Sequence, residues 1–343
     1  MNDKKSIISA GDQMPAVLDS DLHDVEFAAE LSEQEQRELS VPISAHGERL
    51  DKTLALLVPE FSRSYLQQLI ASNAVKINAA THTKPSGRVK AGDALTIELR
   101  PTAQSQAFKP EAMALNIVYE DEYLLVINKP AGLVVHPAPG NWSGTLLNGL
   151  LARDTQALLL PRAGIVHRLD KNTSGLMVVA RTRQTMDRLI DMIAKRSVGR
   201  HYIALAHHEW KGAKTRHVDL PIGRDPKNRL KMSVVDLDRH AGKSAQTDIT
   251  LLQTGTNHCL VLCKLHTGRT HQIRVHMAAI GHCLVADDVY GGLPAGGLQR
   301  QALHALKLSF EHPLTGVMMA FKCPLPDDLC TAISGVGLSY NQN

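Results

Sequence analysis

The sequence predicts an α+β protein in which a small α/β module precedes a larger domain with a mixed, largely antiparallel sheet. Two short helical patterns and alternating strand-like runs share residues 41–100. In the rest of the chain, strand-like runs dominate and do not alternate regularly with helices, as they would in a doubly wound sheet. The chain has 343 residues, of which 43% are hydrophobic and 21% charged, which suits about two globular domains and excludes a disordered polymer.

The N-terminal residues differ in charge from the rest of the chain. Residues 1–39 carry 3 Lys or Arg and 10 Asp or Glu, a net charge of −7, so the remaining residues carry +11 of the chain's total of +4. We expect residues 1–40 to form an acidic, mobile tail, with a short solvated helix over residues 30–38. The basic body fits a polyanionic partner and equally fits ordinary solubility.

The module over residues 41–100 is indicated by periodicity and capping. Three leucines, at positions 50, 54 and 57, recur at helical spacing, and Ser62 is placed to cap a second helix. Alternating apolar residues then predict strands over residues 75–78 and 95–99. Lys52, Arg63 and Arg88 lie beside these elements, where they would either contact phosphates or form a solvated rim.

The larger domain is expected over residues 116–335, after a linker over residues 101–115 with two prolines and before a tail over residues 336–343. Helices are expected over residues 185–196 and in the stretch that ends at residue 281. A hairpin should join residues 306–310 to 317–321. The strand-like runs cover residues 123–128, 176–180, 202–206, 247–252, 259–265 and 303–310.

Residues 164–177 (GIVHRLDKNTSGLM) form the first group that indicates chemistry. Asp170 lies between two apolar runs, with Arg168 and Lys171 close in sequence. Nearby cations favour the ionised carboxylate that a nucleophile or base requires. The alternative is a turn aspartate that bonds its own backbone.

Residues 265–277 (LHTGRTHQIRVHM) form the second group, in which a strand ends and a helix is expected to begin. Arg269 and Arg274, together with His271 and His276, supply donors suited to a carboxylate or a phosphate. A structural ion-pair network is the alternative. The two histidines are five residues apart without the glutamate of a zinc-peptidase motif.

Several other classes of protein are disfavoured by the sequence. The five cysteines are odd in number and clustered late, so we expect reduced thiols. Cys259 and Cys263, near His258 and His266, lack zinc-knuckle spacing, and no metal site is expected. Residues 242–244 lack the upstream glycine of a nucleotide-binding loop. The longest apolar runs are too short for a membrane span, no signal peptide is visible, and a cytoplasmic location is expected.

The small module resembles the RNA-binding module shared by a protein of the small ribosomal subunit, ribosomal protein four, and several RNA-modifying enzymes. The resemblance rests on residues 47–52, 62–64, 75–78 and 91–93. The sequence departs from the pattern at Asn73 and Asn78, close to where that family often has glycine. Asparagine tolerates the left-handed conformation, so we expect the turns to be retained.

The larger domain resembles the large-subunit rRNA pseudouridine synthase family. Residues 164–177, 200–202 and 265–277 carry the resemblance in this order, and residues 118–122, 128–137 and 301–305 strengthen it. The sequence departs from the family at His201, at residues 286–288 and in its acidic tail. The resemblance implies an isomerase that moves the glycosidic bond of uridine from nitrogen to carbon, with no cofactor and no metal.

The resemblance also implies roles for single residues. Asp170 would be the catalytic carboxylate, Arg274 its ionic partner, and Tyr202 the ring that packs on the base and helps to move a proton. Arg168 would fill the space left by the flipped uridine, since a stacked base hides the bond that breaks. Further RNA contacts are implied at His167, Lys171 and Arg269, and at Lys52, Arg63 and Arg88 of the module.

The implied substrate is 23S rRNA in a precursor of the large ribosomal subunit, with uridines 1911, 1915 and 1917 of helix 69 as targets. A monomer with no membrane partner is expected. Three alternatives stay open at this point: a sister enzyme for other 23S rRNA or tRNA uridines, a non-catalytic RNA-binding assembly factor, and a metal-dependent hydrolase built on the histidines.

Overall fold

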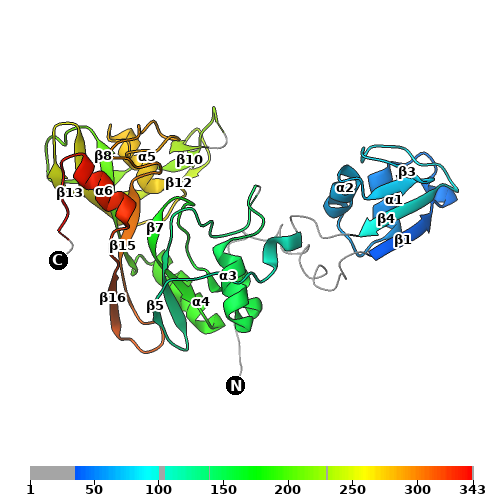
Figure 1. Ribbon diagram of the computed structural model, residues 1–343, viewed down its shortest axis with the longest axis horizontal. Coiled ribbons are helices and arrows are strands. Elements are labelled where there is room, and N and C mark those ends of the chain that lie inside the picture. Colours follow the sequence, from blue (N-terminus) through cyan, green and yellow to red (C-terminus); the bar gives the residue numbers. More distant parts are fainter. Residues whose placement is uncertain (1–34, 100–104, 139, 229–230, 342–343) are drawn as a thin grey trace, which may run out of the picture. The chain divides into compact units, whose positions relative to one another are not determined.

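In the computed structural model, the described residues form two compact units, with the division between Gln106 and Ala107 (Figure 1). The structure describes residues 35–99, 105–138, 140–228 and 231–341. Within these ranges no helix is both long and apolar enough to cross a membrane.

The small unit is a four-stranded sheet with two helices packed against it. The strand order is β1-β4-β2-β3, and buried leucines of both helices join the sheet residues in one core. Ser62 caps the second helix as predicted, because its side chain accepts a hydrogen bond from the Tyr65 backbone N–H. The elements are β1 (Glu35–Ser40), α1 (Leu50–Leu57), α2 (Arg63–Ala71), β2 (Val75–Ile77), β3 (Ala80–Thr81) and β4 (Ala94–Leu99), with a short 3-10 turn at Ile43–Ala45.

Strand β1 corrects two predictions about the N-terminal residues. Residues 35–40 are neither tail nor helix, because they pair antiparallel with β4 along their whole length. Leu39 packs against the core of the small unit while Glu38 and Ser40 are exposed, the period-two pattern of a half-buried strand. The backbone of β4 supplies the hydrogen-bond partners that this acidic segment lacks by itself. The rest of the predicted tail lies outside the described residues.

Asparagine serves in the turns of the small unit as predicted. Asn73 and Asn78 have φ angles of 63° and 47°, and Ala79 follows with 67°. The side-chain carbonyl of Asn78 accepts from the Ala94 N–H, and its amide donates to Asp93. These bonds offset the cost of the left-handed backbone.

The large unit is built on one nine-stranded sheet in which only the β7–β15 pair is parallel. This confirms the predicted mixed, largely antiparallel sheet, the hairpin of β15 and β16, and every predicted strand-like run. The strand order is β5-β6-β7-β15-β8-β14-β13-β9, with β16 on β15. The strands are β5 (Ile117–Glu120), β6 (Leu124–Lys129), β7 (Ser174–Ala180), β8 (Gly199–His207), β9 (Thr215–Asp219), β13 (Gln246–Thr254), β14 (His258–Leu265), β15 (Leu303–Glu311) and β16 (Met318–Lys322).

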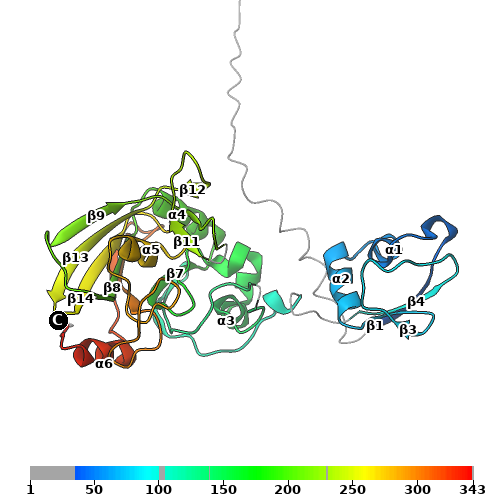
Figure 2. The same ribbon diagram turned by 90° about the horizontal axis from the view of Figure 1, so that it is seen from above.

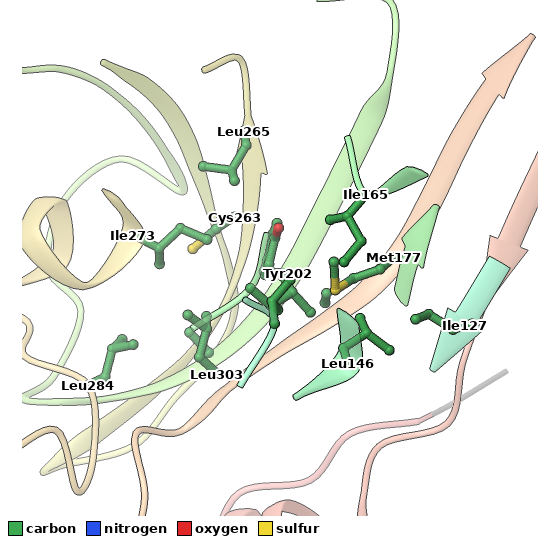
Figure 3. Packing of buried hydrophobic residues seen from close by; sticks show 14 of the residues in the cluster. Ile127, Leu146, Ile165, Met177, Tyr202, Cys263, Leu265, Ile273, Leu284 and Leu303 are labelled. Atoms are coloured by element: carbon green, nitrogen blue, oxygen red, sulfur yellow. The ribbon is translucent and has the colours of Figure 1, made fainter. Parts of the chain in front are cut away.

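Helices cover both faces of this sheet, and a small second sheet lies in the same unit. One core lies under α3 and α5 and includes Tyr202, which Figure 3 shows in the middle of the cluster. On the opposite face, α4 and α6 cover two further clusters. The helices are α3 (Leu146–Arg153), α4 (Arg183–Ala194), α5 (Gln272–Ala279) and α6 (Asp327–Gly335), with 3-10 turns at Ser105–Phe108, Thr155–Leu159 and Pro161–Gly164. The second sheet, in order β11-β10-β12, consists of β10 (Ile222–Arg224), β11 (Met232–Val234) and β12 (Gly242–Lys243).

The predicted linker and C-terminal tail are both longer than the structure supports. Residues of the predicted linker from 107 onward belong to the large unit, because the buried Asn148 side chain donates to the backbone carbonyls of Ala107 and Lys109. Leu338 is buried against α6, and the Ser339 N–H donates to Gln253. Residues 336–339 therefore complete the core instead of forming a tail.

Candidate active site

Asp170 occupies a turn that leads directly into β7. The Thr173 N–H donates to the Asp170 carbonyl at 3.0 Å, and the strand begins at Ser174. Leu169 is buried in the core beneath this turn. The turn therefore holds the Asp170 side chain at the end of a strand that is buried along its length.

Arg274 brings the two predicted groups together. Its Nη1 donates to Asp170 Oδ2 at 3.2 Å, although the two residues are 104 positions apart. Arg274 lies in the first turn of α5, and its side chain is only 5% exposed. The carboxylate of Asp170, 16% exposed, thus bonds an arginine and not its own turn. This is the contact that the predicted roles require.

Asp287 fixes the guanidinium of Arg274 and was missed in the sequence. Its carboxylate has no exposed surface and accepts from Arg274 Nε at 2.7 Å and Nη2 at 2.8 Å. Burial alone would lower the pKa of Arg274, but its bonds to Asp287 and the charge of Asp170 raise it above the ordinary value. The arginine is therefore a permanent cation beside Asp170. The only signal in the sequence was the departure at residues 286–288.

His271 and Tyr290 close the other side of the Asp170 carboxylate. His271 Nε2 lies 3.9 Å from Asp170 Oδ1, while its Nδ1 is 2.8 Å from the Tyr290 hydroxyl. Burial lowers the pKa of His271, although Asp170 opposes this shift. The guanidinium of Arg274 lies 5.0 Å from the centre of the Tyr290 ring. Tyr290 was not among the predicted site residues.

Tyr202 lies on β8 with its ring inside the core. Burial raises the pKa of Tyr202 to about 12; the charge of Arg200 opposes the shift and that of Asp170 adds to it. The phenol is therefore neutral at neutral pH. It presents a flat apolar ring with one hydroxyl near two charged groups.

Lys129 is a buried cation that supports the Asp170 turn and was not singled out in the sequence. Its ammonium donates to the carbonyls of Pro130, Leu133 and Lys171 at 2.8, 2.9 and 3.1 Å. The last bond ties the residue after Asp170 to the end of β6. Burial lowers the pKa of Lys129 to about 7, although the negative charge of Asp170 opposes this.

Three of the predicted RNA contacts in the large unit remain available to a ligand. Arg168 and Lys171 are exposed, and half-buried Arg269 donates to the Ser244 carbonyl. His167 differs, because its Nε2 accepts from the Val178 N–H at 3.1 Å and burial lowers its pKa to about 3. A neutral ring bonded to β7 orders the segment before Asp170 and supplies no cation for a phosphate.

The predicted basic residues of the small unit already have partners within it. Lys52 pairs with Glu48 at 3.1 Å, and Arg63 donates to the buried Asp51 at 2.8 Å. Arg88 donates to the Gly47 carbonyl. The side chains of Lys52 and Arg63 are at least half exposed, so each keeps a face for a phosphate.

Cys259, one of the cysteines considered as a metal ligand, lies buried beside a histidine. Cys259 Sγ lies 3.7 Å from His282 Nδ1, and burial raises the pKa of the Cys259 thiol to about 12. A thiol that resists ionisation is a poor metal ligand.

The large unit therefore provides one partly open carboxylate together with a neutral, buried aromatic ring. Among the described residues, the Asp170 side chain receives one hydrogen bond, from a fixed cation, so one oxygen remains for reaction. The site has the parts of a carboxylate nucleophile, and the small unit adds a basic module.

Comparison with known families identifies the class of enzyme to which this fold and site belong. The family model for RNA pseudouridylate synthase matches residues 123–279, and the S4 domain model matches residues 48–95. The chain belongs to the RNA pseudouridylate synthase family and is an isomerase of uridine in RNA. This confirms the predicted class of enzyme and the RNA-binding module.

Curated relatives match nearly the whole chain. "Ribosomal large subunit pseudouridine synthase D" of Neisseria meningitidis serogroup B is 46% identical over 330 residues, which are 92% of this chain and 86% of the relative. The protein of the same name from Pseudomonas aeruginosa is 44% identical over 317 residues, 89% of this chain and 97% of the relative. Among solved structures, "Human RNA Pseudouridylate Synthase Domain Containing 4" is 25% identical with a TM-score of 0.51, covering 66% of this chain and 94% of that chain.

Proposed function

We propose that this enzyme forms pseudouridine in the RNA of the large ribosomal subunit, at uridines 1911, 1915 and 1917 of helix 69 in 23S rRNA. The names of relatives at 44–46% identity support the large subunit as the target. The observation that carries the catalytic proposal is the Asp170–Arg274 pair at the end of β7.

Asp170 acts as the nucleophile in this proposal. Its carboxylate attacks the target nucleotide at the sugar carbon or at the ring, and the bond from the sugar carbon to the ring nitrogen breaks. The base then turns, and the sugar carbon bonds to ring carbon five. The bond between Asp170 and the nucleotide breaks, which frees the carboxylate again. The proton of ring carbon five is lost and the ring nitrogen gains one, so substrate and product are isomers and no redox partner is needed.

Arg274 and Tyr202 prepare the site for this reaction. Arg274 holds the Asp170 carboxylate in position, because Asp287 fixes the guanidinium from the far side. The neutral ring of Tyr202 packs on the base, and its hydroxyl helps to move the proton from ring carbon five. A phenol with a pKa raised to about 12 serves best as a relay beside a second acceptor.

RNA binding uses both units. Arg168, next to the catalytic turn, occupies the space that the flipped uridine leaves, while Lys171 and Arg269 contact nearby phosphates. Lys52, Arg63 and Arg88 do so in the small unit. Flipping costs a few kcal/mol, which such contacts must offset. The enzyme acts as a monomer in the cytoplasm, without cofactor or metal in the reaction.

The test is to map pseudouridine by chemical labelling in 23S rRNA and tRNA from cells that lack the protein. Loss at helix 69 that is restored by the intact chain and not by Asp170→Asn would support both target and nucleophile. Loss elsewhere would keep the reaction and move the target to that of a sister enzyme. No loss anywhere would favour a non-catalytic RNA-binding assembly factor and contradict the proposal.

A further inference from the structure

A second group of reactive side chains lies in the large unit, on three neighbouring strands. His217 is on β9, Asp248 on β13, and His266 directly follows β14. Figure 2 shows these strands side by side at one edge of the sheet. Asp248 is the direct register partner of His217, and the His266 N–H donates to the Gln246 carbonyl. The sheet therefore fixes the backbone of all three residues.

The side chains of these three residues converge. His217 Nδ1 lies 2.6 Å from Asp248 Oδ1, and His266 Nε2 lies 2.6 Å from Asp248 Oδ2. One ligand atom from each residue lies within 4.8 Å of the other two. The two imidazole rings meet edge to face, with centres 6.1 Å apart. Two nitrogens and one carboxylate oxygen can therefore surround a single ion after small side-chain rotations.

An ordinary surface ion pair explains this arrangement less well. Lys264 is the register partner of Asp248 on its other side, in β14. If the carboxylate only neutralised charge, this lysine would be its natural partner. Among the described residues, however, Lys264 forms no ion pair with Asp248, and both carboxylate oxygens point to histidines. The cluster selects imidazole over ammonium, which is the preference of a metal site.

We propose that His217, Asp248 and His266 bind a divalent transition-metal ion, with Zn²⁺ the best match to two imidazoles and one carboxylate. Water would complete the coordination. In the part of the chain that the structure describes, the outer ring nitrogens of both histidines lack hydrogen-bond partners, and such partners strengthen metal sites 10- to 100-fold. The ion is therefore exchangeable.

Bound metal would join β9, β13 and the segment that leads to α5. His266 precedes Thr267, whose hydroxyl donates to Gln272 Oε1 at the start of α5, the helix that carries Arg274. In this proposal the ion stabilises the fold and takes no part in the isomerisation. We expect Zn²⁺ to raise the unfolding temperature of the large unit while uridine turnover in excess chelator stays unchanged.

The experiment uses the full chain without a polyhistidine tag, stripped with a chelator. Co²⁺ is titrated with visible absorption as the readout, and Zn²⁺ by competition with a coloured chelator. We expect one ion per chain and at least about tenfold weaker binding in His217→Ala and in Asp248→Asn. Asp248→Asn keeps the size of the side chain and one of its two acceptor oxygens, so it separates lost ligation from lost folding.

The matched control is His258→Gln, at the other end of β14. Its ring lies 5.2 Å from that of His207, and within the described ranges neither histidine forms an ion pair with a carboxylate. We expect this variant to bind Co²⁺ as the unmodified chain does. The proposal is overturned if the unmodified chain binds no ion, if the cluster variants bind equally well, or if only His258→Gln loses binding.

Discussion

Asp51 in the small unit and Asp170 in the large unit both pair with arginine, but the two carboxylates are held to different degrees. Asp51 of the small unit has no exposed surface and accepts five hydrogen bonds, from Arg49, Arg63 and Gln67. Asp170 of the large unit accepts one from an arginine and stays partly exposed. A carboxylate whose lone pairs are all used can only support the fold.

In the large unit, Asp287 fixes the position of Arg274, and this leaves the carboxylate of Asp170 open to react. Asp287 is buried and accepts the two shorter hydrogen bonds from Arg274, whereas Asp170 accepts the remaining, longer one. The cation is thus fixed without help from the nucleophile. A reactive carboxylate must therefore be held in place while some of its lone pairs remain free of hydrogen bonds.

The largest effect is expected from Asp170→Asn. Turnover should fall by at least about 10⁴-fold, because an amide cannot attack the nucleotide and catalytic nucleophiles typically contribute this much. The unfolding temperature and RNA affinity should stay close to those of the unmodified enzyme, since asparagine keeps the shape and one acceptor for Arg274. Tritium release from labelled uridine and a filter-binding assay measure the two quantities. Turnover within tenfold of the original would refute the proposed nucleophile.

Arg274→Met should have the next largest effect, because it affects folding as well as turnover. Removing the guanidinium leaves Asp287 buried without a partner, which should cost about 3–5 kcal/mol of unfolding free energy. Urea unfolding of the large unit measures this. The double variant Arg274→Met/Asp287→Leu should regain most of the stability and none of the turnover. If the double variant recovers turnover, Arg274 does not act on Asp170.

Asp51→Asn makes the same change from carboxylate to amide as Asp170→Asn, but at the carboxylate whose lone pairs are all used. We expect a loss of about 2 kcal/mol in the unfolding free energy of the small unit, because hydrogen bonds to a charged group are lost. Turnover on a saturating RNA fragment should change no more than about threefold, since the change leaves the nucleophile intact. Calorimetry with two resolved transitions separates the units. Unchanged stability would show that the Asp51 cluster is not structural.

The same cluster should make the small unit sensitive to acid. Hydrogen bonds, first of all from Arg49, hold the pKa of Asp51 well below its ordinary value of 3.8. The folded state thus binds the proton more weakly than the unfolded state, so the contribution of Asp51 to stability is complete above pH 3.8 and is lost as the pH falls further. Asp51→Asn should remove this part of the acid response. An identical acid profile in both proteins would contradict the assignment.

The sequence could predict the Asp170–Arg274 pair because each residue lies in a run of residues that resembles a motif of the synthase family. Asp287 and Tyr290 were not predictable, since their partners Arg274 and His271 become neighbours only when the loop after α5 folds back. Strand β1 was missed for a similar reason. Its acidic sequence resembles a solvated segment, and only the edge of β4 makes it a strand. Long-range pairing decides each of these cases.

Lys129 offers the finest test of how the large unit supports its open carboxylate. Burial lowers its pKa from 10.5 to about 7, so the folded state binds this proton more weakly than the unfolded state. Its contribution to stability should therefore rise as the pH increases from about 7 to 10.5 and be lost on returning to pH 7.

Lys129→Met should remove this slope from the urea unfolding of the large unit, while the small unit serves as the internal control. Because Lys129 holds the backbone beside Asp170, the variant should also lower turnover by about tenfold, less than the roughly 100-fold that a 1 Å misplacement of a reacting group can cost. A stability difference that stays constant across this pH range would mean that the ammonium keeps its ordinary pKa. The backbone beside Asp170 would then be held by an ammonium that stays charged across most of this range.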